Sequence, residues 1–135
     1  MLDKARIDYY RKLGLKITPQ RMAILEYLEG NTSHPTAEDI YRHVSEKFPS
    51  MSFATVYNTL EALKEKGLVT ELNIEGGRKR FDPNPEPHHH FVCTQCGKIV
   101  DISDPLELDL QNFDHKGVTI EKFQVLLYGR CSECK

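Results

Sequence analysis

Through the first 67 residues, apolar side chains recur every three or four positions, which is the spacing of amphipathic helices. Several residues mark where these helices begin. Thr18-Pro19 places a capping residue before a proline, Thr36 and Asp39 have the spacing of a capping box, and Ser52 can cap a further helix. The pattern therefore predicts four helices. Their expected buried residues are Leu2, Tyr9 and Leu13, then Met22, Leu25 and Leu28, then Ala37, Ile40, Tyr41, Val44 and Phe48, and finally Phe53, Val56, Leu60 and Leu63.

After Gly67 the period changes to two, which is the pattern of strands with one buried face. Residues 68–74 alternate in this way, Gly76-Gly77 is a two-residue hairpin signal, and residues 78–81 supply a basic return strand. Helices followed by a small basic hairpin are the layout of a winged helix-turn-helix. We therefore predict an α+β protein whose first domain covers residues 1–82.

Three prolines within residues 83–87 can continue neither a strand nor a helix, so we predict a hinge there. Beyond it, residues 88–135 are expected to form a small α/β dimerisation domain. Strands are predicted at Ile99–Ile102 and Val118–Tyr128, flanking a helix from Pro105 to about Lys116. A unit of about 50 residues with few large apolar side chains needs a cross-link or metal for stability.

Composition narrows the class of protein. Hydrophobic residues make up 39% of the chain, charged residues make up 28%, and no apolar run approaches the ~20 residues of a membrane span. The opening residues, MLDKARIDYYRKL, carry alternating charges and do not resemble a signal peptide. We expect a cytoplasmic protein with reduced thiols and no membrane partner. The net charge of −2 gives no indication of nucleic-acid binding by itself.

Four cysteines form two C-x-x-C pairs, Cys93 with Cys96 and Cys131 with Cys134. Each pair can direct two thiolates at one tetrahedral ion, so the arrangement predicts a closed, structural Zn²⁺ site. Disulfides are the first alternative, and the reducing compartment disfavours them. A redox C-x-x-C is the second, and it needs only one pair.

Three consecutive histidines precede the first cysteine. On a strand His88 and His90 point to one face and His89 to the other, so His88 and His90 can chelate one ion. Asp82, Asp101 and His34 are further candidate ligands. Imidazole and carboxylate together suit Fe²⁺, Mn²⁺, Ni²⁺, Co²⁺ or Zn²⁺. The alternative is a solvated linker, and the role of His89 is open on either interpretation.

The fourth predicted helix presents Ala54, Thr55, Tyr57 and Asn58 away from its expected buried positions. Tyr57 can contact a thymine methyl group and Asn58 can pair with an adenine edge, whereas Arg21 of the second helix can contact phosphate. For Tyr57 the alternative is a partly buried helix aromatic. The helix is therefore a candidate recognition helix.

Taken together, these segments resemble the ferric uptake regulator family of bacterial metal-dependent repressors. The resemblance covers nearly the whole chain, through LKITPQRMAILEYL, HPTAEDIY, MSFATVYNTL, GLV, RFD, HHHFVCTQCGKIVD and YGRCSEC in family order. It implies a homodimer that binds double-stranded DNA at an A·T-rich palindromic operator, with Lys16 in the minor groove. It also implies a structural zinc at the four cysteines and a regulatory Fe²⁺ or Mn²⁺ at His34, Asp82, His88, His90 and Asp101.

Within the family the chain is most similar to the peroxide-responsive repressors. Asp82 stands where iron sensors usually have glutamate, and the chain has no fifth cysteine of the kind that zinc sensors use. Many iron sensors have a further metal site that uses a histidine a few residues before the last C-x-x-C. Phe123 stands near that place in this chain, so the further site is expected to be lost.

The resemblance thus implies a regulator, not an enzyme, that senses peroxide through Fe²⁺-catalysed oxidation of its own histidines. An iron-sensing repressor that uses Fe²⁺ only as corepressor is the alternative. A small zinc hydrolase with His88, His90 and Asp101 as ligands is a candidate from another class. It lacks an evident general base beside the histidines and leaves the helical half without a purpose.

Overall fold

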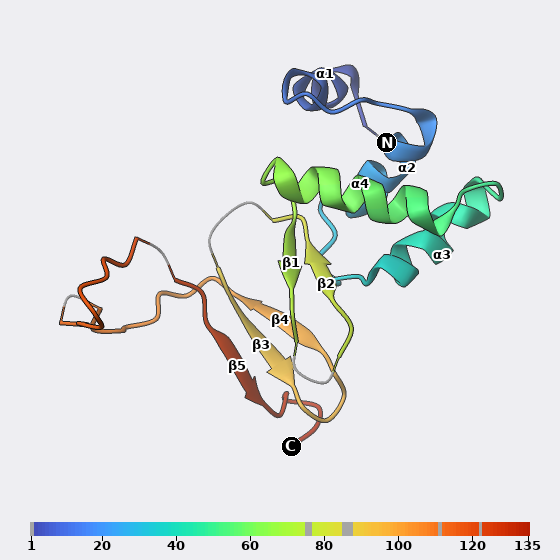
Figure 1. Cartoon of the computed structure of the whole chain (residues 1–135). Helices are drawn as coiled ribbons and strands as arrows, with labels where there is room; N and C mark the ends of the chain where they lie inside the picture. The colour runs from blue at the N-terminus through green and yellow to red at the C-terminus, as the bar shows by residue number, and fades with distance from the viewer. Residues whose placement is uncertain (1, 75–76, 85–87, 111, 122) are drawn as a thin grey trace. The chain divides into compact units, whose positions relative to one another are not determined.

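A computed structural model describes residues 2–74, 77–84, 88–110, 112–121 and 123–135. The chain divides into two compact units, Met1–Pro85 and Glu86–Lys135 (Figure 1). The predicted hinge falls partly outside the described residues, which omit 85–87. The assignment of DNA binding to the first unit and of dimerisation to the second stays a prediction from the sequence.

The described residues of the first unit form four helices followed by a two-stranded hairpin, as the sequence pattern predicts. Each predicted capping residue accepts a backbone N–H, and Thr36 and Asp39 form a complete capping box at 3.1 Å in both directions. Asp3 adds a cap that the pattern did not reveal. The helices are α1 Lys4–Lys12, α2 Pro19–Leu28, α3 Ala37–Lys47 and α4 Phe53–Glu65.

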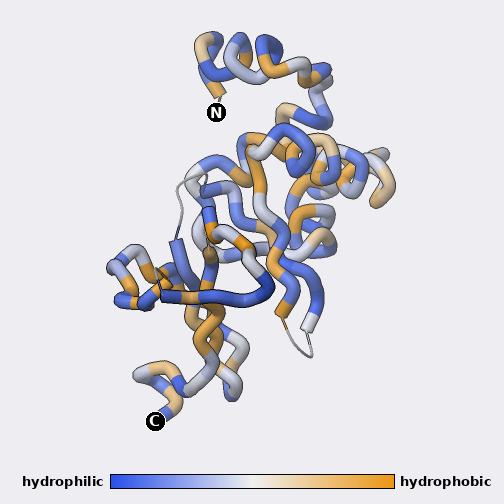
Figure 2. Tube along the Cα trace, turned by 60° about the vertical axis from the view of Figure 1, so that its left-hand side comes forward, coloured by the Kyte–Doolittle hydropathy of each residue, from blue (hydrophilic) through white to orange (hydrophobic). Residues whose placement is uncertain are grey.

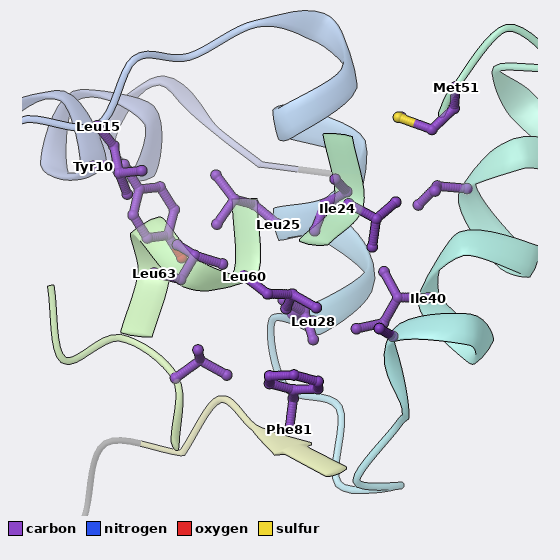
Figure 3. Packing of buried hydrophobic residues seen from close by; sticks show 14 of the residues in the cluster. Tyr10, Leu15, Ile24, Leu25, Leu28, Ile40, Met51, Leu60, Leu63 and Phe81 are labelled. Atoms are coloured by element: carbon purple, nitrogen blue, oxygen red, sulfur yellow. The ribbon is translucent and has the colours of Figure 1, made fainter. Parts of the chain in front are cut away.

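The core of this unit lies among the inner faces of α2, α3 and α4, and the hairpin contributes one aromatic ring to it. Figure 3 shows Ile24, Leu28, Ile40, Leu60 and Phe81 directed toward one another. Ile24 and Ile40 have no exposed surface. Burial at this level contributes roughly 1.5–3 kcal/mol per large apolar side chain, so this cluster fixes how the helices pack.

Two predicted core positions are wrong. In α1 the buried aromatic is Tyr10, whereas Tyr9 is 43% exposed. The hydroxyl of Tyr10 lies between Arg6 and Glu29, at 3.1 and 3.5 Å, so it can be buried without losing its polar partners. At the start of α4, Phe53 is 40% exposed and packs edge-on against the ring of Tyr41.

The buried stripe of α4 also includes Thr59, a polar residue that is not among the expected buried positions. Its hydroxyl donates to the carbonyl of Thr55 at 2.8 Å, which satisfies the hydroxyl inside the helix. The stripe therefore consists of Val56, Thr59, Leu60 and Leu63.

The hairpin pairs β1 (Thr70–Leu72) with β2 (Arg80–Asp82) in antiparallel register, with Leu72 opposite Arg80 and Thr70 opposite Asp82. Its outer strand is also tied to the loop before α3, because the N–H of Phe81 donates to the carbonyl of Pro35 at 2.9 Å. The hairpin thereby fixes the loop that carries His34.

The second unit is built on a three-stranded sheet with β3 in the centre. The strands are β3 His89–Cys93, β4 Ile99–Ile102 and β5 Leu126–Gly129, in the order β4-β3-β5. β4 runs antiparallel to β3, with His90 opposite Asp101, whereas β5 runs parallel to it, with His90 opposite Leu126. This register brings the histidine run, Asp101 and the end of the chain together within one unit.

The predicted helix from Pro105 to about Lys116 is wrong, and so is most of the predicted strand Val118–Tyr128. Residues 103–110, 112–121 and 123–125 form neither helix nor strand. A short helix gains most of its stability by packing an apolar face, and here Leu108 and Phe113 are 51% and 48% exposed. Only the last part of the predicted strand is found, in β5, where pairing with β3 holds it.

Along the helices, hydrophobic and hydrophilic positions alternate in the manner expected for elements with one buried face (Figure 2). No helix in the described part of the chain has the length and apolarity that a membrane crossing requires. With the winged helix-turn-helix layout and the small sheet unit, the predicted α+β class is confirmed, although the described part of the second unit has no helix.

Candidate metal centres

The four cysteines of the second unit converge as the two C-x-x-C pairs predict. Their sulfur atoms all lie within 4.8 Å of one another, and Cys96 Sγ is 3.8 Å from Cys131 Sγ. Four sulfurs at ~2.3 Å from a tetrahedral Zn²⁺ are about 3.8 Å apart, whereas a disulfide needs about 2.05 Å. The thiols therefore have the spacing of a tetrathiolate zinc site and not that of two disulfides.

Local backbone structure positions these thiols. The N–H of Cys96 and the N–H of Cys131 each donate to Cys93 Sγ at 3.4 Å, so both turns point at the same sulfur. Gly97 closes the first turn with φ +79°, a left-handed conformation that glycine adopts without strain. The Thr94 N–H donates to the Gly129 carbonyl at 2.7 Å and fixes the second turn beside the first.

These hydrogen bonds also shift the pKa values of two of the thiols in opposite directions. Donation by the backbone N–H of Cys96, assisted by that of Cys131, lowers the pKa of Cys93 to about 6. Hydrogen bonding with the Cys131 thiol, followed by that with Cys96, raises the pKa of Cys134 to about 12. Zn²⁺ displaces thiol protons when it binds, so affinity at this site falls as the pH falls.

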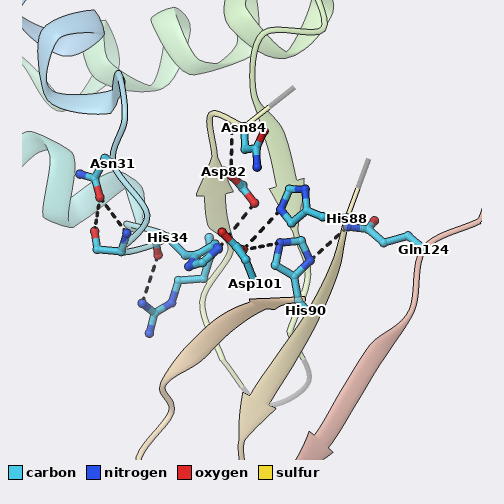
Figure 4. Close-up of polar contacts among 10 residues, drawn as sticks. Asn31, His34, Asp82, Asn84, His88, His90, Asp101 and Gln124 are labelled. Carbon is cyan, nitrogen blue, oxygen red and sulfur yellow. Dashed lines mark hydrogen bonds and ion pairs between the residues drawn. The ribbon is translucent and has the colours of Figure 1, made fainter. Parts of the chain in front are cut away.

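A second group of donors forms within the same unit from His88, His90 and Asp101. Asp101 Oδ1 lies 3.4 Å from His88 Nε2 and 3.3 Å from His90 Nε2, as the dashed lines in Figure 4 mark. The two imidazole rings meet edge to face with their centroids 4.4 Å apart. His90 is fully buried and Asp101 side-chain exposure is 22%. Two imidazole nitrogens and one carboxylate oxygen thus converge on one point.

The first unit holds a smaller group of the same chemistry. His34 Nε2 lies 3.5 Å from Asp82 Oδ2, and the two side chains are only 2% and 3% exposed. Charged or polar groups are buried this deeply only when they are paired or bind an ion. The Asn84 N–H donates to the other oxygen, Asp82 Oδ1, at 2.9 Å and holds the carboxylate in place.

The backbone at His34 adopts an uncommon conformation that the surrounding residues impose. Its φ of +53° lies in the left-handed region, which is unfavourable for a residue with a side chain. The loop is held by Arg80 Nη1, which donates to the His34 carbonyl at 3.2 Å, and by the Phe81 bond to Pro35. Such conformations concentrate at functional sites because neighbouring contacts must over-determine them.

The candidate DNA contacts all lie in the first unit. Tyr57 is 42% exposed, so part of its side chain lies on the surface of α4. Asn58 and Lys16 are exposed as well. Thr55 is partly buried, and its Oγ1 lies 2.8 Å from the hydroxyl of the capping residue Ser52. The guanidinium of Arg21 donates to the carbonyl of Lys16 at 3.2 Å, which stiffens the turn before α2.

Three residues near the candidate ligands carry no motif that sequence reasoning could use. Asn84 holds Asp82, as described above. Gln124 contacts His90 Nδ1 at 3.2 Å, and the Val125 N–H donates to His89 Nδ1 at 3.0 Å. The only relevant signal was the position of Phe123, whose ring stacks on His89 at 5.3 Å. Phe123, near the place where many iron sensors have a further ligand histidine, is thus a stacking partner of His89.

Residues 12–128 match the sequence model of the family described as "Ferric uptake regulator family". The chain belongs to that family. It is 45% identical over 129 residues to the peroxide-responsive repressor PerR of Staphylococcus epidermidis, which covers 93% of this chain and 85% of that protein. It is 44% identical to the peroxide operon regulator of Bacillus subtilis, with 97% and 92% covered.

A solved structure of a family member gives the same fold. That structure is of PerR from Streptococcus pyogenes, which senses peroxide and regulates genes. It is 34% identical to this chain and superposes with a TM-score of 0.56. The superposition covers 99% of this chain and 95% of that one. The family resemblance predicted from the motifs is therefore confirmed, including its peroxide-responsive branch.

Proposed function

We propose that this protein is a metal-dependent, peroxide-sensing transcriptional repressor of the ferric uptake regulator family. Its relatives at 43–45% identity are named as peroxide-responsive regulators, and this supports the peroxide signal. The observation that carries the mechanism is the division of the imidazole and carboxylate donors. His34 and Asp82 converge within the first unit, and His88, His90 and Asp101 converge within the second.

One regulatory ion bound by both donor groups would fix the orientation of the two units relative to one another. Asp82 and His88 are six residues apart, so their Cα atoms can never be more than ~21 Å apart. The short connection would allow the two donor groups to meet at one ion. An ion that takes ligands from both favours the conformation in which they meet, which is how a ligand shifts a conformational equilibrium.

The donor set indicates which ions the regulatory site would take. Three imidazole nitrogens and two short carboxylates form an intermediate-hardness set that suits Fe²⁺ or Mn²⁺. If all five protein donors held one six-coordinate ion, one position would remain for a small molecule, whereas the four thiolates would fill a tetrahedral site completely. The thiol site therefore fits a structural Zn²⁺ that supports the second unit, and the imidazole–carboxylate site fits a regulatory ion that a small molecule can approach.

DNA binding would follow from the fixed angle between the units. In a homodimer two copies of α4 must meet successive major grooves of a palindromic operator, so their separation decides affinity. Exposed Tyr57 and Asn58 would contact base edges in an A·T-rich site, and Thr55 would support them from the first turn of α4. Lys16 and Arg21 would contact the minor groove and the phosphates.

Peroxide would act on the ligands themselves. Bound Fe²⁺ supplies the ability to reduce H₂O₂ beside its own imidazole ligands, and Mn²⁺ does so poorly. Net oxidation transfers one oxygen atom and withdraws two electrons from an imidazole ring, and peroxide leaves as water. His34 and His88 are the proposed targets. An oxidised imidazole is a poorer ligand, so the two units would separate and the operator would be released without any change to the cysteines.

The test compares the same dimer loaded with Fe²⁺ or with Mn²⁺ under anaerobic conditions. Gel shifts on an A·T-rich palindrome should show binding with either metal and none after its removal. Hydrogen peroxide should then release DNA only from the Fe²⁺ protein. Mass spectrometry should find one added oxygen on the peptides that contain His34 or His88.

Intact DNA binding and unmodified histidines after peroxide would instead indicate the plain iron sensor. Hydrolytic activity in the holo-protein without operator binding would support the zinc hydrolase. A dimer that binds operator equally well without metal would overturn the proposal. The reduced thiols required by the zinc site are expected in the cytoplasm, where such a repressor would meet DNA.

A further inference from the structure

The middle histidine of the run, His89, has a structural partner on the face of β3 opposite the candidate ligands. Its Nδ1 accepts the backbone N–H of Val125 at 3.0 Å, and its ring stacks on Phe123 with an interplanar angle of 26°. A backbone N–H can only donate, so Nδ1 must keep its lone pair and the proton of neutral His89 lies on Nε2. His89 is thereby engaged in holding the chain just before β5.

The same short segment contacts His90 in two further places. The N–H of His90 donates to the carbonyl of Val125 at 3.1 Å, and the amide nitrogen of Gln124 lies 3.2 Å from His90 Nδ1. Figure 4 shows the Gln124 side chain directed at the ring nitrogen remote from Asp101. Residues 123–125 therefore contact both neighbouring histidines. They contact His89 through its ring and Nδ1, and His90 through its backbone N–H and Nδ1.

The contact at His90 Nδ1 matters because the other nitrogen is the candidate metal donor. In the metal-free protein, Nε2 lies 3.3 Å from Asp101 Oδ1 and can donate its proton there. The Gln124 NH₂ group then donates to Nδ1. When Nε2 instead ligates an ion, the proton must be on Nδ1, and the amide must present its oxygen as acceptor.

A glutamine side chain can serve either tautomer, because its amide carries a donor and an acceptor that exchange places on rotation. A glutamate can only accept and would favour the metal-bound tautomer permanently. A methionine of similar size does neither. Gln124 is thus a partner that permits His90 to pass between its metal-free and metal-bound states.

We propose that Gln124 is a positioning residue for the regulatory site, which sets the tautomer of His90, and that His89 acts through the 123–125 segment to hold Gln124 in place. This inference rests on the proposed function, since His90 must ligate a metal for the tautomer to affect affinity. It assigns His89 a role in alignment rather than in metal binding.

The test measures Mn²⁺ affinity by competition titration of the zinc-loaded protein. Outer partners of metal-ligating histidines typically change affinity by ~10–100-fold. We expect Gln124→Met to weaken Mn²⁺ binding about 10-fold and Gln124→Glu to strengthen it. Gln20→Met and Gln20→Glu, at the start of α2 and outside both donor groups, are the matched controls and should stay within about twofold of wild type.

A second readout does not depend on metal affinity. Ring ¹⁵N chemical shifts of His90 report its tautomer, and in the metal-free protein they should place the proton on Nε2. Addition of diamagnetic Zn²⁺ to the regulatory site should move it to Nδ1. The Gln124→Glu variant should hold the proton on Nδ1 before any metal is added.

His89→Phe keeps a ring to stack on Phe123 but removes the acceptor for Val125. If His89 acts through Gln124, this variant should weaken Mn²⁺ binding, and adding Gln124→Met should cause less further loss than it causes alone. Additive losses would separate His89 from the proposed role.

The outcomes distinguish this inference from the proposed function. Wild-type protein that fails to bind Mn²⁺ would overturn the repressor mechanism, while the ¹⁵N measurement would still decide the Gln124 contact. Wild-type protein that binds Mn²⁺, with both Gln124 variants binding equally well and an unchanged His90 tautomer, would overturn the inference alone. Zinc content and melting temperature, measured for every variant, identify a loss caused by misfolding, and a variant that keeps both but loses Mn²⁺ supports the positioning role.

Discussion

The thiol site and the imidazole–carboxylate donors differ in how they are distributed along the chain. All four cysteines belong to one unit, and their sulfur atoms already have the spacing of ligands around a tetrahedral ion. The other donors divide into a pair in one unit and a trio in the other. An ion held by one unit can only stabilise that unit, whereas an ion held by two also reports whether they meet. The same fold can therefore use one metal for stability and another as a signal.

The largest effect should follow from breaking the site that one unit holds alone. Cys96→Ser removes a thiolate from a closed site, and much of the folding energy of such a small unit comes from its metal. We expect zinc content to fall from about one ion per chain to none, together with loss of the dimer. Metal analysis and sedimentation measure both. Ser132→Ala, at an exposed position between the second pair of cysteines, is the control. A dimeric Cys96→Ser protein with unchanged melting would contradict a structural role.

Breaking the divided site should leave the fold intact. Asp101→Asn removes the carboxylate shared by His88 and His90, so Mn²⁺-dependent operator binding should fall by at least about 100-fold, more than the loss of an outer partner causes. Zinc content and dimer formation should persist, which separates the two sites. Asp104→Asn, an exposed neighbour, supplies the comparison. Loss of zinc from the Asp101 variant would show that the two sites are not independent.

A subtler change should separate metal binding from peroxide sensing. Asp82→Glu keeps a carboxylate but lengthens it, so under the proposed function it would compete for the coordination position that peroxide needs. We expect Mn²⁺-dependent DNA binding to remain, while oxidation of His34 or His88 in the Fe²⁺ protein falls severalfold by mass spectrometry. Equal oxidation of wild type and variant would show that the length of this carboxylate does not control access to the iron.

A change that leaves both metal sites intact concerns a region that neither metal would contact. Tyr57→Ala on the exposed face of α4 should weaken specific operator binding by ~1–3 kcal/mol and leave non-specific binding nearly unchanged. Lys16→Ala should instead lower affinity for all sequences and reduce the salt dependence by about one ion. Fluorescence anisotropy over a range of salt concentrations measures both. If neither variant alters operator affinity, the recognition helix has been assigned wrongly.

The sequence predicts best where local chemistry decides the structure. Thr18, Thr36 and Ser52 cap their helices because a side-chain oxygen three residues before a free N–H needs no distant partner. The C-x-x-C pairs are similar, since each turn is local and a tetrahedral ion can use only one arrangement of four thiols. Tyr57 is exposed because it lies on the face of α4 opposite the buried stripe, and its contact with DNA stays a prediction.

Prediction fails where distant contacts decide. The residues after Pro105 have helical spacing, but a short helix also needs an apolar surface, and spacing cannot reveal whether one exists. Tyr10 replaces Tyr9 in the core because its hydroxyl forms hydrogen bonds with Arg6 and Glu29. Gln124 escaped notice because a lone glutamine carries no pattern. Its importance comes from a parallel strand pairing between residues more than thirty positions apart.

The parallel pairing of β3 with β5 has a consequence for biosynthesis. The helices and the hairpin of the first unit use residues up to Asp82, so this unit can fold while the rest of the chain is being translated. The sheet of the second unit needs residues 126–129, and its zinc ligands need Cys131 and Cys134. Until those residues emerge from the ribosome, Cys93 and Cys96 form only half of a site. Under the proposed function, the nascent chain would thus complete the unit that carries the candidate DNA contacts first and the unit that carries the thiol site last.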